Sequence, residues 1–236
     1  MVKQFFMGAL IALMACAAPK QTENNPVKAT PVVEGAEIEL LAVPQEGGAT
    51  INEALWARKS SRDFTAEALT LEELSGVIWA AAGVNRPENQ HLTALPAKGF
   101  CRFAAEPAQT YNNIRTYAFL AEGVYRYDAA AHRLVRVAEG DHRPLTAMQE
   151  FANQAALNLV YVADLSVYGG KHIPTEKVKS LCGLDAAGYA ENANLYAAAH
   201  NLKAITRGSY KEAELLQLLG LDPENHCVAL AQTIGK

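Results

Sequence analysis

The chain has 236 residues, of which 50% are hydrophobic, so it is long and apolar enough to bury one or two cores. Its formal net charge is -4 and it contains no long basic run, which argues against nucleic acid as a partner because phosphate-backbone binding requires clustered Lys and Arg. No CxxC pair occurs, and we therefore expect no metal site.

Residues 1–15 have the pattern of a bacterial export signal. Lys3 precedes a short apolar run, Phe5 to Ala15, which is too short to span a bilayer as a stable helix. The sequence Leu-Met-Ala-Cys at 13–16 then resembles a lipobox, so we expect a lipoprotein signal peptide and lipidation of Cys16. A plain signal peptide cut one residue before or after Cys16 is the alternative. Either reading predicts a protein of the bacterial cell envelope, facing the periplasm or the cell surface, and lipidation would make the lipid its only membrane anchor.

Residues 16–48 are expected to form a flexible tether, because Pro, Asn, Thr and Gly are frequent and periodicity is weak. Within this tether, the run from Ile38 to Val43 favours either a short strand or an arm laid over the body. We expect the folded domain to occupy residues 49–236.

The cysteines beyond Cys16 indicate little chemistry. Cys101, Cys182 and Cys227 are expected to be idle thiols, and a single disulfide among them is the alternative.

A capping box formed by Thr50 and Glu53 predicts the first helix of the domain. Ile51 and Leu55 mark one face of this helix, and Trp56 is expected in the core.

The segment Thr70-Leu71-Glu72-Glu73 is a second capping box, and apolar residues at helical spacing follow it until Gly83. Trp79 of this second helix is also expected in the core. The link between the two helices therefore carries a cluster of cations and hydroxyls, Arg58-Lys59-Ser60-Ser61-Arg62. Such a cluster can grip a phosphate, although a charge run is also typical of solvated surface.

Residues 88–112 show no sustained period and are expected to be a long loop, of a kind that is usually functional or disordered. The elements predicted after it are strands at 115–120, 124–127 and 134–137, a helix at 144–157, a strand at 158–163, a long Ala-rich central helix at 184–201, a strand at 203–206, a helix at 212–219 and a final strand at 227–234. This order predicts an α+β fold with a mostly antiparallel central sheet surrounded by helices.

Several segments share a likeness to one known family. They are ARKSSRDF at 57–64, LTLEELSGVIWAAAGVNRP at 69–87, the meander at 122–143, the Ala-rich helix and strand at 184–210, LLQLLGLD at 215–222 and QTIGK at 232–236. In this order they resemble the nitroreductase family, and in particular its SagB-like branch, over about residues 50–236.

The resemblance implies a site for flavin mononucleotide (FMN). The positions that match the family's flavin contacts are Arg58, Lys59, Ser60, Arg62, Arg207, Gly208 and Lys236. Asp185 and Asn192 match a segment of the long helix that lies under the flavin and at the dimer interface in the family. For Arg207, an ion pair with Glu212 is the alternative, and no catalytic side chain is assigned because the cofactor carries the chemistry.

The resemblance also implies an activity and a partner. NAD(P)H would reduce the flavin and a small-molecule acceptor would then reoxidise it, in a ping-pong cycle carried out by a homodimer. The alternative is a lipid-anchored binding module that keeps the fold but has lost turnover, because residues 88–112 depart from the family's Arg-Thr-Ala-Pro-Ser-Ala segment. A third reading is peptide maturation, since the SagB-like branch includes azoline-oxidising enzymes.

Overall fold

The computed structural model describes residues 37–86, 91–92, 113–168 and 174–236. The expected signal peptide with Cys16, most of the tether, Cys101 and nearly all of the 88–112 loop lie outside these residues. None of the helices in the described ranges is long and apolar enough to cross a membrane.

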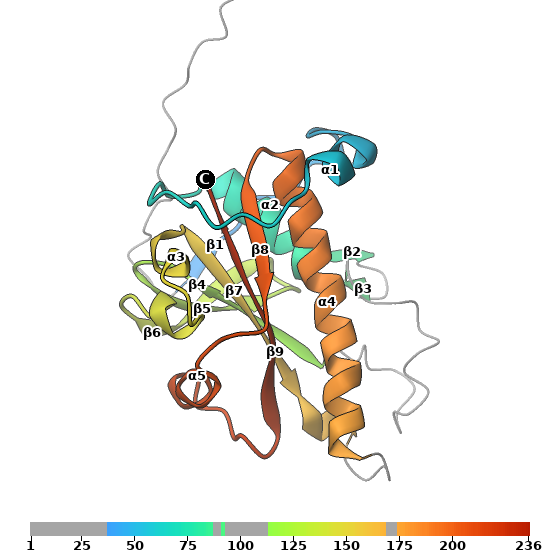
Figure 1. The fold of residues 1–236 in the computed structure, drawn as a ribbon. Coiled ribbons are helices and arrows are strands. Elements are labelled where there is room, and N and C mark those ends of the chain that lie inside the picture. Colours follow the sequence, from blue (N-terminus) through green and yellow to red (C-terminus); the bar gives the residue numbers. More distant parts are fainter. Residues whose placement is uncertain (1–36, 87–90, 93–112, 169–173) are drawn as a thin grey trace, which may run out of the picture.

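A single sheet of seven strands organises the domain (Figure 1), in the order β1-β6-β5-β4-β7-β9-β8. Every neighbouring pair in this order is antiparallel. The strands are β1 Glu37–Glu39, β4 Ile114–Phe119, β5 Gly123–Asp128, β6 Arg133–Glu139, β7 Leu157–Asp164, β8 Lys203–Arg207 and β9 His226–Gly235, and a separate hairpin pairs β2 Val84–Arg86 with β3 His91–Leu92. The predicted α+β fold is confirmed.

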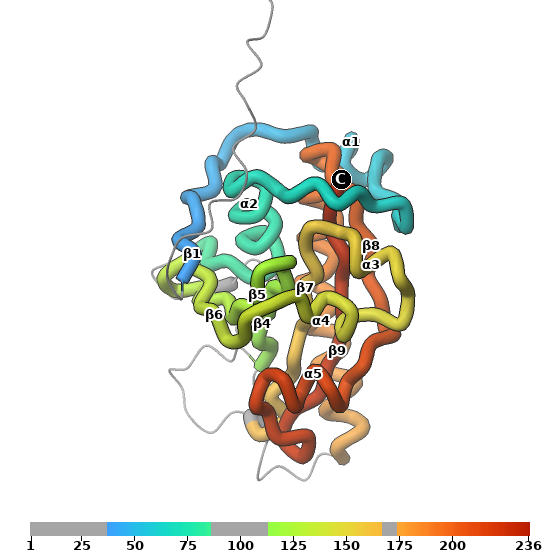
Figure 2. Tube along the Cα trace, turned by 90° about the vertical axis from the view of Figure 1, so that its left-hand side faces the viewer, coloured from blue at the N-terminus to red at the C-terminus, as the bar shows by residue number. Residues whose placement is uncertain are grey.

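Helices cover both faces of this sheet (Figures 1 and 2). They are α1 Ile51–Ala57, α2 Leu71–Ala82, α3 Phe151–Gln154, α4 Thr175–Ala199 and α5 Glu212–Leu218, with short 3-10 turns η1 Arg143–Leu145 and η2 Leu165–Tyr168. The main core lies between the sheet and helices α2 and α4, and a smaller core lies between the opposite face and α5. Alternation along the strands separates the two cores: Leu159 and Tyr161 of β7 face α4, whereas Val160 and Val162 face α5.

Both predicted capping boxes are present. Thr50 and Glu53 close the N-terminus of α1, and Thr70 and Glu73 close that of α2, each with reciprocal hydrogen bonds between side chain and backbone. These local contacts depend on residues three apart, which is why the sequence alone locates both helix starts.

The predicted helix at 144–157 is wrong, because side-chain donors bind the carbonyl groups that such a helix would need. Arg207 donates to the Thr146 carbonyl, Asn158 donates to that of Ala152 at 2.8 Å, and Arg143 donates to that of Ala155 at 2.8 Å. The stretch therefore breaks into η1 and the single turn of α3, and β7 already begins at Leu157.

The long helix begins earlier than predicted, at Thr175, directly after Pro174. The core placement of the tryptophans is also wrong. Trp56 is 91% exposed, while Ile51 and Leu55 beside it are 61% and 54% exposed. Trp79 is only half-buried, and its indole N–H donates to the Val84 carbonyl at 3.3 Å.

The segment around Ile38 combines both predicted forms, a short strand followed by an arm. Residues 37–39 pair with β6, and the Leu41 N–H then donates to the Ser75 hydroxyl at 2.9 Å. His132, in the turn before β6 with a positive φ of 51°, holds the end of this arm. Its Nε2 lies 2.8 Å from the Leu41 carbonyl and its Nδ1 2.8 Å from the Tyr127 hydroxyl, so the arm is fixed to the β5–β6 hairpin.

Helix α4 can lie close to its neighbours because small residues face them. Ala186, Ala190, Ala193 and Ala197 are all buried against the main core. On the other side of the contact, Gly76 of α2 meets the ring of Tyr196, and a Cβ at Gly76 would lie 1.8 Å from the Tyr196 hydroxyl oxygen. The Tyr196 ring stacks on His200 at 3.9 Å between centroids, which limits its freedom to move aside.

We therefore expect Gly76→Ala to lower the free energy of unfolding by about 1–3 kcal/mol through overpacking. Gly183→Ala, inside α4 with no atom near its would-be Cβ, is the matched control and should stabilise by about 0.5–1 kcal/mol. Urea unfolding followed by circular dichroism measures both. Equal stability of Gly76→Ala and the wild type would refute the close contact.

Candidate functional site

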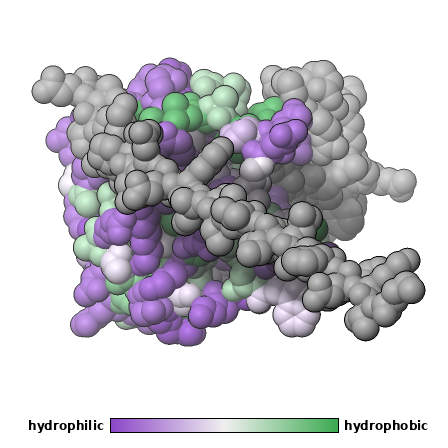
Figure 3. Space-filling view, turned by 90° about the horizontal axis from the view of Figure 1, so that it is seen from above, coloured by the Kyte–Doolittle hydropathy of each residue, from purple (hydrophilic) through white to green (hydrophobic). Residues whose placement is uncertain are grey.

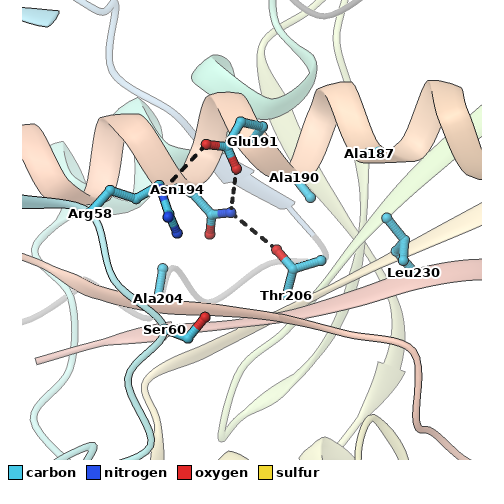
Figure 4. A pocket seen from close by; sticks show the side chains of 9 residues that line it. All are labelled: Arg58, Ser60, Ala187, Ala190, Glu191, Asn194, Ala204, Thr206 and Leu230. Carbon is cyan, nitrogen blue, oxygen red and sulfur yellow. Dashed lines mark hydrogen bonds and ion pairs between the residues drawn. The ribbon is translucent and has the colours of Figure 1, made fainter. Parts of the chain in front are cut away.

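A groove of about 280 Å³ lies between helix α4 and strand β8 (Figure 4). Its lining residues come from the α1–α2 link, α4, β8 and β9, and they are Arg58, Ser60, Ala187, Ala190, Glu191, Asn194, Ala204, Thr206 and Leu230. In Figure 4, Ala187 and Leu230 mark one end of the groove, and Arg58 and Ala204 mark the other.

The link after α1 reaches the groove because it runs along the free edge of β8. Ser60 forms a parallel bridge with Ala204, and the Ser61 N–H donates to the Ala204 carbonyl at 3.0 Å. Alternation along β8 then turns Ala204 and Thr206 toward the groove, whereas Ile205 and Arg207 face the other side of the sheet. Two segments more than 100 residues apart in the sequence are thereby brought together at Ser60 and Ala204.

The polar contacts of the groove converge on Asn194 of α4. Its amide nitrogen donates to Glu191 at 3.0 Å and to the Thr206 hydroxyl at 3.2 Å, and its amide oxygen accepts from Gln232 at 2.7 Å. Gln232, fully buried, also donates to the Ala190 carbonyl and accepts from the Tyr161 hydroxyl. A buried network in which each member has partners is rigid, so the floor of the groove is preorganised.

Arg58 and Glu191 are the charged residues among those that line the groove. Their closest nitrogen and oxygen atoms are 3.7 Å apart, and the two side chains are 39% and 51% exposed. An ion pair this long and this exposed contributes little to stability. Arg58 can therefore exchange the Glu191 carboxylate for an anionic ligand at small cost.

Arg207 does not line the groove, and it does not pair with Glu212, which instead accepts a hydrogen bond from the Val228 N–H at 2.9 Å. Its guanidinium is buried on the opposite face of the sheet, where it donates to Thr233 and Asn158 at 3.0 Å each and to the Thr146 carbonyl. Among the described residues no carboxylate pairs with it, and burial lowers its pKa to about 10. The alternative of an ion pair with Glu212 is therefore wrong, whereas the flavin contact stays a prediction for a residue whose side chain does not line the groove.

Lys236 also lies away from the groove lining. Its ammonium is 2.7 Å from a carboxylate oxygen of Glu67 and 3.4 Å from one of Glu73, and the hydrogen bond to Glu67 is the main cause of its raised pKa. Gly208 is exposed at the end of β8, and no atom lies near its would-be Cβ.

The other predicted cations are exposed. Lys59 lines a second hollow that adjoins the groove, and Arg62 has no ion-pair partner within the described ranges. On α4, Asp185 accepts a hydrogen bond from Asn113 at 3.3 Å, and burial raises its pKa, while Asn192 does not line the groove. Of the predicted contacts, the structure thus places Arg58 and Ser60 in the groove.

The sequence reasoning missed most of the groove lining, including Glu191, Asn194, Thr206 and Leu230. Helical spacing could have predicted the groove residues of α4, since positions 187, 190, 191 and 194 lie on one helical face. Alternation along the predicted strand at 203–206 could likewise have predicted Thr206. No local sequence pattern predicts Leu230 or the supporting Gln232 as part of the site, because the residues that they meet lie on α4, about 40 positions earlier.

The nitroreductase family profile matches residues 55–236. A candidate nitroreductase of Methanocaldococcus jannaschii is 27% identical over 177 residues, 72% of this chain and 83% of the relative. The crystal structure of a candidate nitroreductase from Ralstonia eutropha JMP134 is 32% identical, with a TM-score of 0.72 over 89% of this chain and 93% of that one. An NADPH:FMN oxidoreductase from Vibrio harveyi, complexed with NAD+, shares the fold at 18% identity, with a TM-score of 0.51 over 78% of this chain and 67% of that one.

The burial of Arg207 predicts a structural role for this residue. We expect Arg207→Met to lower the free energy of unfolding by about 2 kcal/mol, because it leaves the buried Thr146 carbonyl without a donor and removes the charged bonds to Asn158 and Thr233. Arg126→Met, at an exposed position of β5, should change it by less than about 0.5 kcal/mol. Urea unfolding of both variants measures the difference, and equal losses would contradict the assignment.

Proposed function

The chain belongs to the nitroreductase family, and on that premise we propose that it is an FMN-dependent oxidoreductase that takes electrons from NAD(P)H and passes them to a small-molecule acceptor in a ping-pong cycle. The observation that carries this proposal is the groove between α4 and β8, which combines a cation and a hydroxyl at one end with small side chains along its floor.

The groove residues fit the two parts of FMN. Arg58 offers a planar set of N–H donors for a phosphate, and Ser60 adds a hydroxyl beside it. Ala187, Ala190 and Ala204 carry nothing beyond Cβ, so a flat ring can lie close to the backbone there.

The residues of the groove have separate roles in the proposed reaction. When bound, FMN supplies the hydride chemistry. Arg58 and Ser60 bind its phosphate, while Asn194 holds Glu191 and Thr206 in fixed positions through hydrogen bonds. Glu191 would release its ion pair with Arg58, which is 3.7 Å long and solvent-exposed, to make that guanidinium available to the phosphate. No side chain of the groove is assigned as a catalytic acid or base.

A second candidate function, a binding module that has lost turnover, is favoured by the charges that the groove lacks. Arg207 is buried on the other face of the sheet, and Lys236 is neutralised by Glu67 and Glu73. Two of the cations expected to contact the flavin are thereby engaged elsewhere. Oxidation of NAD(P)H by the flavin-loaded protein distinguishes turnover from binding alone.

We further propose a place in the cell and in the family, supported by sequence patterns. The lipobox-like residues 13–16 support a signal peptide at 1–15, a lipid on Cys16 and a tether to residue 48. The domain at 49–236 would then lie at the face of a bacterial envelope membrane. The segments that resemble the SagB-like branch support membership of that branch.

We also propose that the protein is a homodimer. Trp56, Leu55 and Ile51 expose apolar side chains on α1. The face at the α1 end of the molecule shows hydrophobic residues among hydrophilic ones (Figure 3). Large apolar side chains that gather on one face are typical of a surface that another protein covers.

Loss of the phosphate grip should weaken flavin binding. We expect Arg58→Ala to raise the dissociation constant for FMN by about 10-fold to 100-fold, the effect of removing charge-assisted hydrogen bonds. Quenching of FMN fluorescence on titration measures this constant. Lys179→Ala, at an exposed site near the start of α4, is the control and should bind FMN like the wild type. Equal affinity of Arg58→Ala and the wild type would sink the groove as the flavin site.

The dimer proposal predicts that charged substitutions on α1 lower the mass of the protein in solution from two chains to one. Light scattering after size exclusion should give the wild type about twice the mass of one 25.4 kDa chain, before any processing. Trp56→Lys combined with Leu55→Glu should give a single chain, because it places charges in an apolar contact. Met148→Lys, which alters another exposed apolar residue, should keep the mass of the wild type. A monomeric wild type at micromolar concentration would overturn the proposal.

A further inference from the structure

One carboxylate and one cation face each other in the groove (Figure 4). Among the described residues that line it, Glu191 alone carries a negative charge and Arg58 alone carries a positive one. The second hollow, which adjoins the groove and shares Arg58 with it, has no carboxylate in its described lining. Glu191 is therefore the lining residue that opposes an anion at Arg58.

The two oxygens of the Glu191 carboxylate have different partners. Its Oε2 accepts a hydrogen bond from the amide nitrogen of Asn194 at 3.0 Å, whereas its Oε1 lies 3.7 Å from Nε of Arg58. The contact with Arg58 can therefore break while the bond to Asn194 remains. Glu191 then stays at the wall of the groove after Arg58 has turned toward a ligand.

Asn194 is a firm support for this carboxylate because it is itself held on two other sides. It donates to the Thr206 hydroxyl at 3.2 Å and accepts from the buried Gln232 at 2.7 Å. Complete retreat of Glu191 into solvent would give up the bond to Asn194. We therefore expect the negative charge to remain beside the groove when the site is filled.

A ligand phosphate in the groove would meet Glu191 in two ways. The carboxylate competes with the phosphate for the Arg58 guanidinium, and its charge then repels the bound phosphate at a distance over which water screens only in part. No other cation in the described lining of the groove offsets this repulsion. Lys236, for example, is already paired with Glu67 and Glu73.

From these contacts we propose that Glu191 is a specificity-determining residue, an internal competitor for Arg58 that lowers the affinity of the groove for a ligand that carries a phosphate. This inference rests on the proposed flavin site. It goes beyond that site by predicting that the phosphate end of FMN is held weakly, so that FMN exchanges with solvent instead of staying permanently bound. In the empty protein the same ion pair neutralises Arg58, and the groove needs no ligand to do so.

Glu191→Gln is the deciding variant, because Gln keeps an oxygen that can accept from Asn194 while the negative charge is removed. We expect the dissociation constant for FMN to fall by about threefold to tenfold, the effect of removing a half-exposed carboxylate from beside a cation and a phosphate. Quenching of FMN fluorescence on titration measures this constant. Inorganic phosphate, added as a competitor of FMN, should bind more tightly by a similar factor, because the effect concerns the phosphate group.

Three controls separate competition at Arg58 from other effects. Glu176→Gln removes a negative charge from the same helix, at a site that is 88% exposed and outside the groove lining, and should bind FMN like the wild type. Riboflavin, which lacks the phosphate, should bind equally well to Glu191→Gln and to the wild type. In the Arg58→Ala background, Glu191→Gln should give a smaller gain in FMN affinity, because no guanidinium is left to compete for.

The two proposals fail in different ways. FMN affinity that Glu191→Gln leaves unchanged or weakens, an equal gain for riboflavin, or an equal gain in the Arg58→Ala background would overturn the role of Glu191 and leave the flavin site intact. Absence of FMN binding in both the wild type and Glu191→Gln, with both proteins folded, would overturn the proposed function as well.

Discussion

The close approach of helix α4 to the sheet is the constraint on which the rest of the structure depends. It is possible because alanines line the inner face of the helix and because Gly76 leaves room for Tyr196 on the neighbouring α2. The same proximity allows Gln232 of β9 to donate to the Ala190 carbonyl and to the side chain of Asn194. A bulkier helix would stand further from the sheet, and the network that supports the groove would lose its bonds.

This network links the core to the groove in a few steps. The Tyr161 hydroxyl donates to Gln232, Gln232 donates to Asn194, and Asn194 donates to both Glu191 and Thr206. The inner members are fully buried, whereas Glu191 is half-exposed. A rigid buried network that supports a half-exposed, movable carboxylate suits a site in which ligands are exchanged.

The sequence predicts well those features that depend on near neighbours. Both capping boxes and most strands lie where the local pattern placed them, because residues two to four positions apart determine these elements. The helix at 144–157 fails because Arg207, from a distant strand, and Asn158, at the start of the next strand, bind its carbonyl groups. The core placement of Trp56 is wrong because helical periodicity does not show which side chains of a helix stay exposed to solvent.

The candidate site divides in the same way. The family resemblance directs attention to Arg58 and Ser60, which line the groove. Lys236 forms ion pairs with Glu67 and Glu73, which are distant from it in the sequence, so only the three-dimensional structure shows this pairing.

The parallel bridge between Ser60 and Ala204 has a consequence for how the protein can assemble. Strand β8 ends the sheet, and an open edge strand is a template on which another chain can add a strand of its own. The link that carries Ser60 occupies this edge, and at the opposite edge the described part of β1 is three residues long. Addition of a strand from another molecule is thereby hindered at the β8 edge, because the link already pairs with Ala204 there.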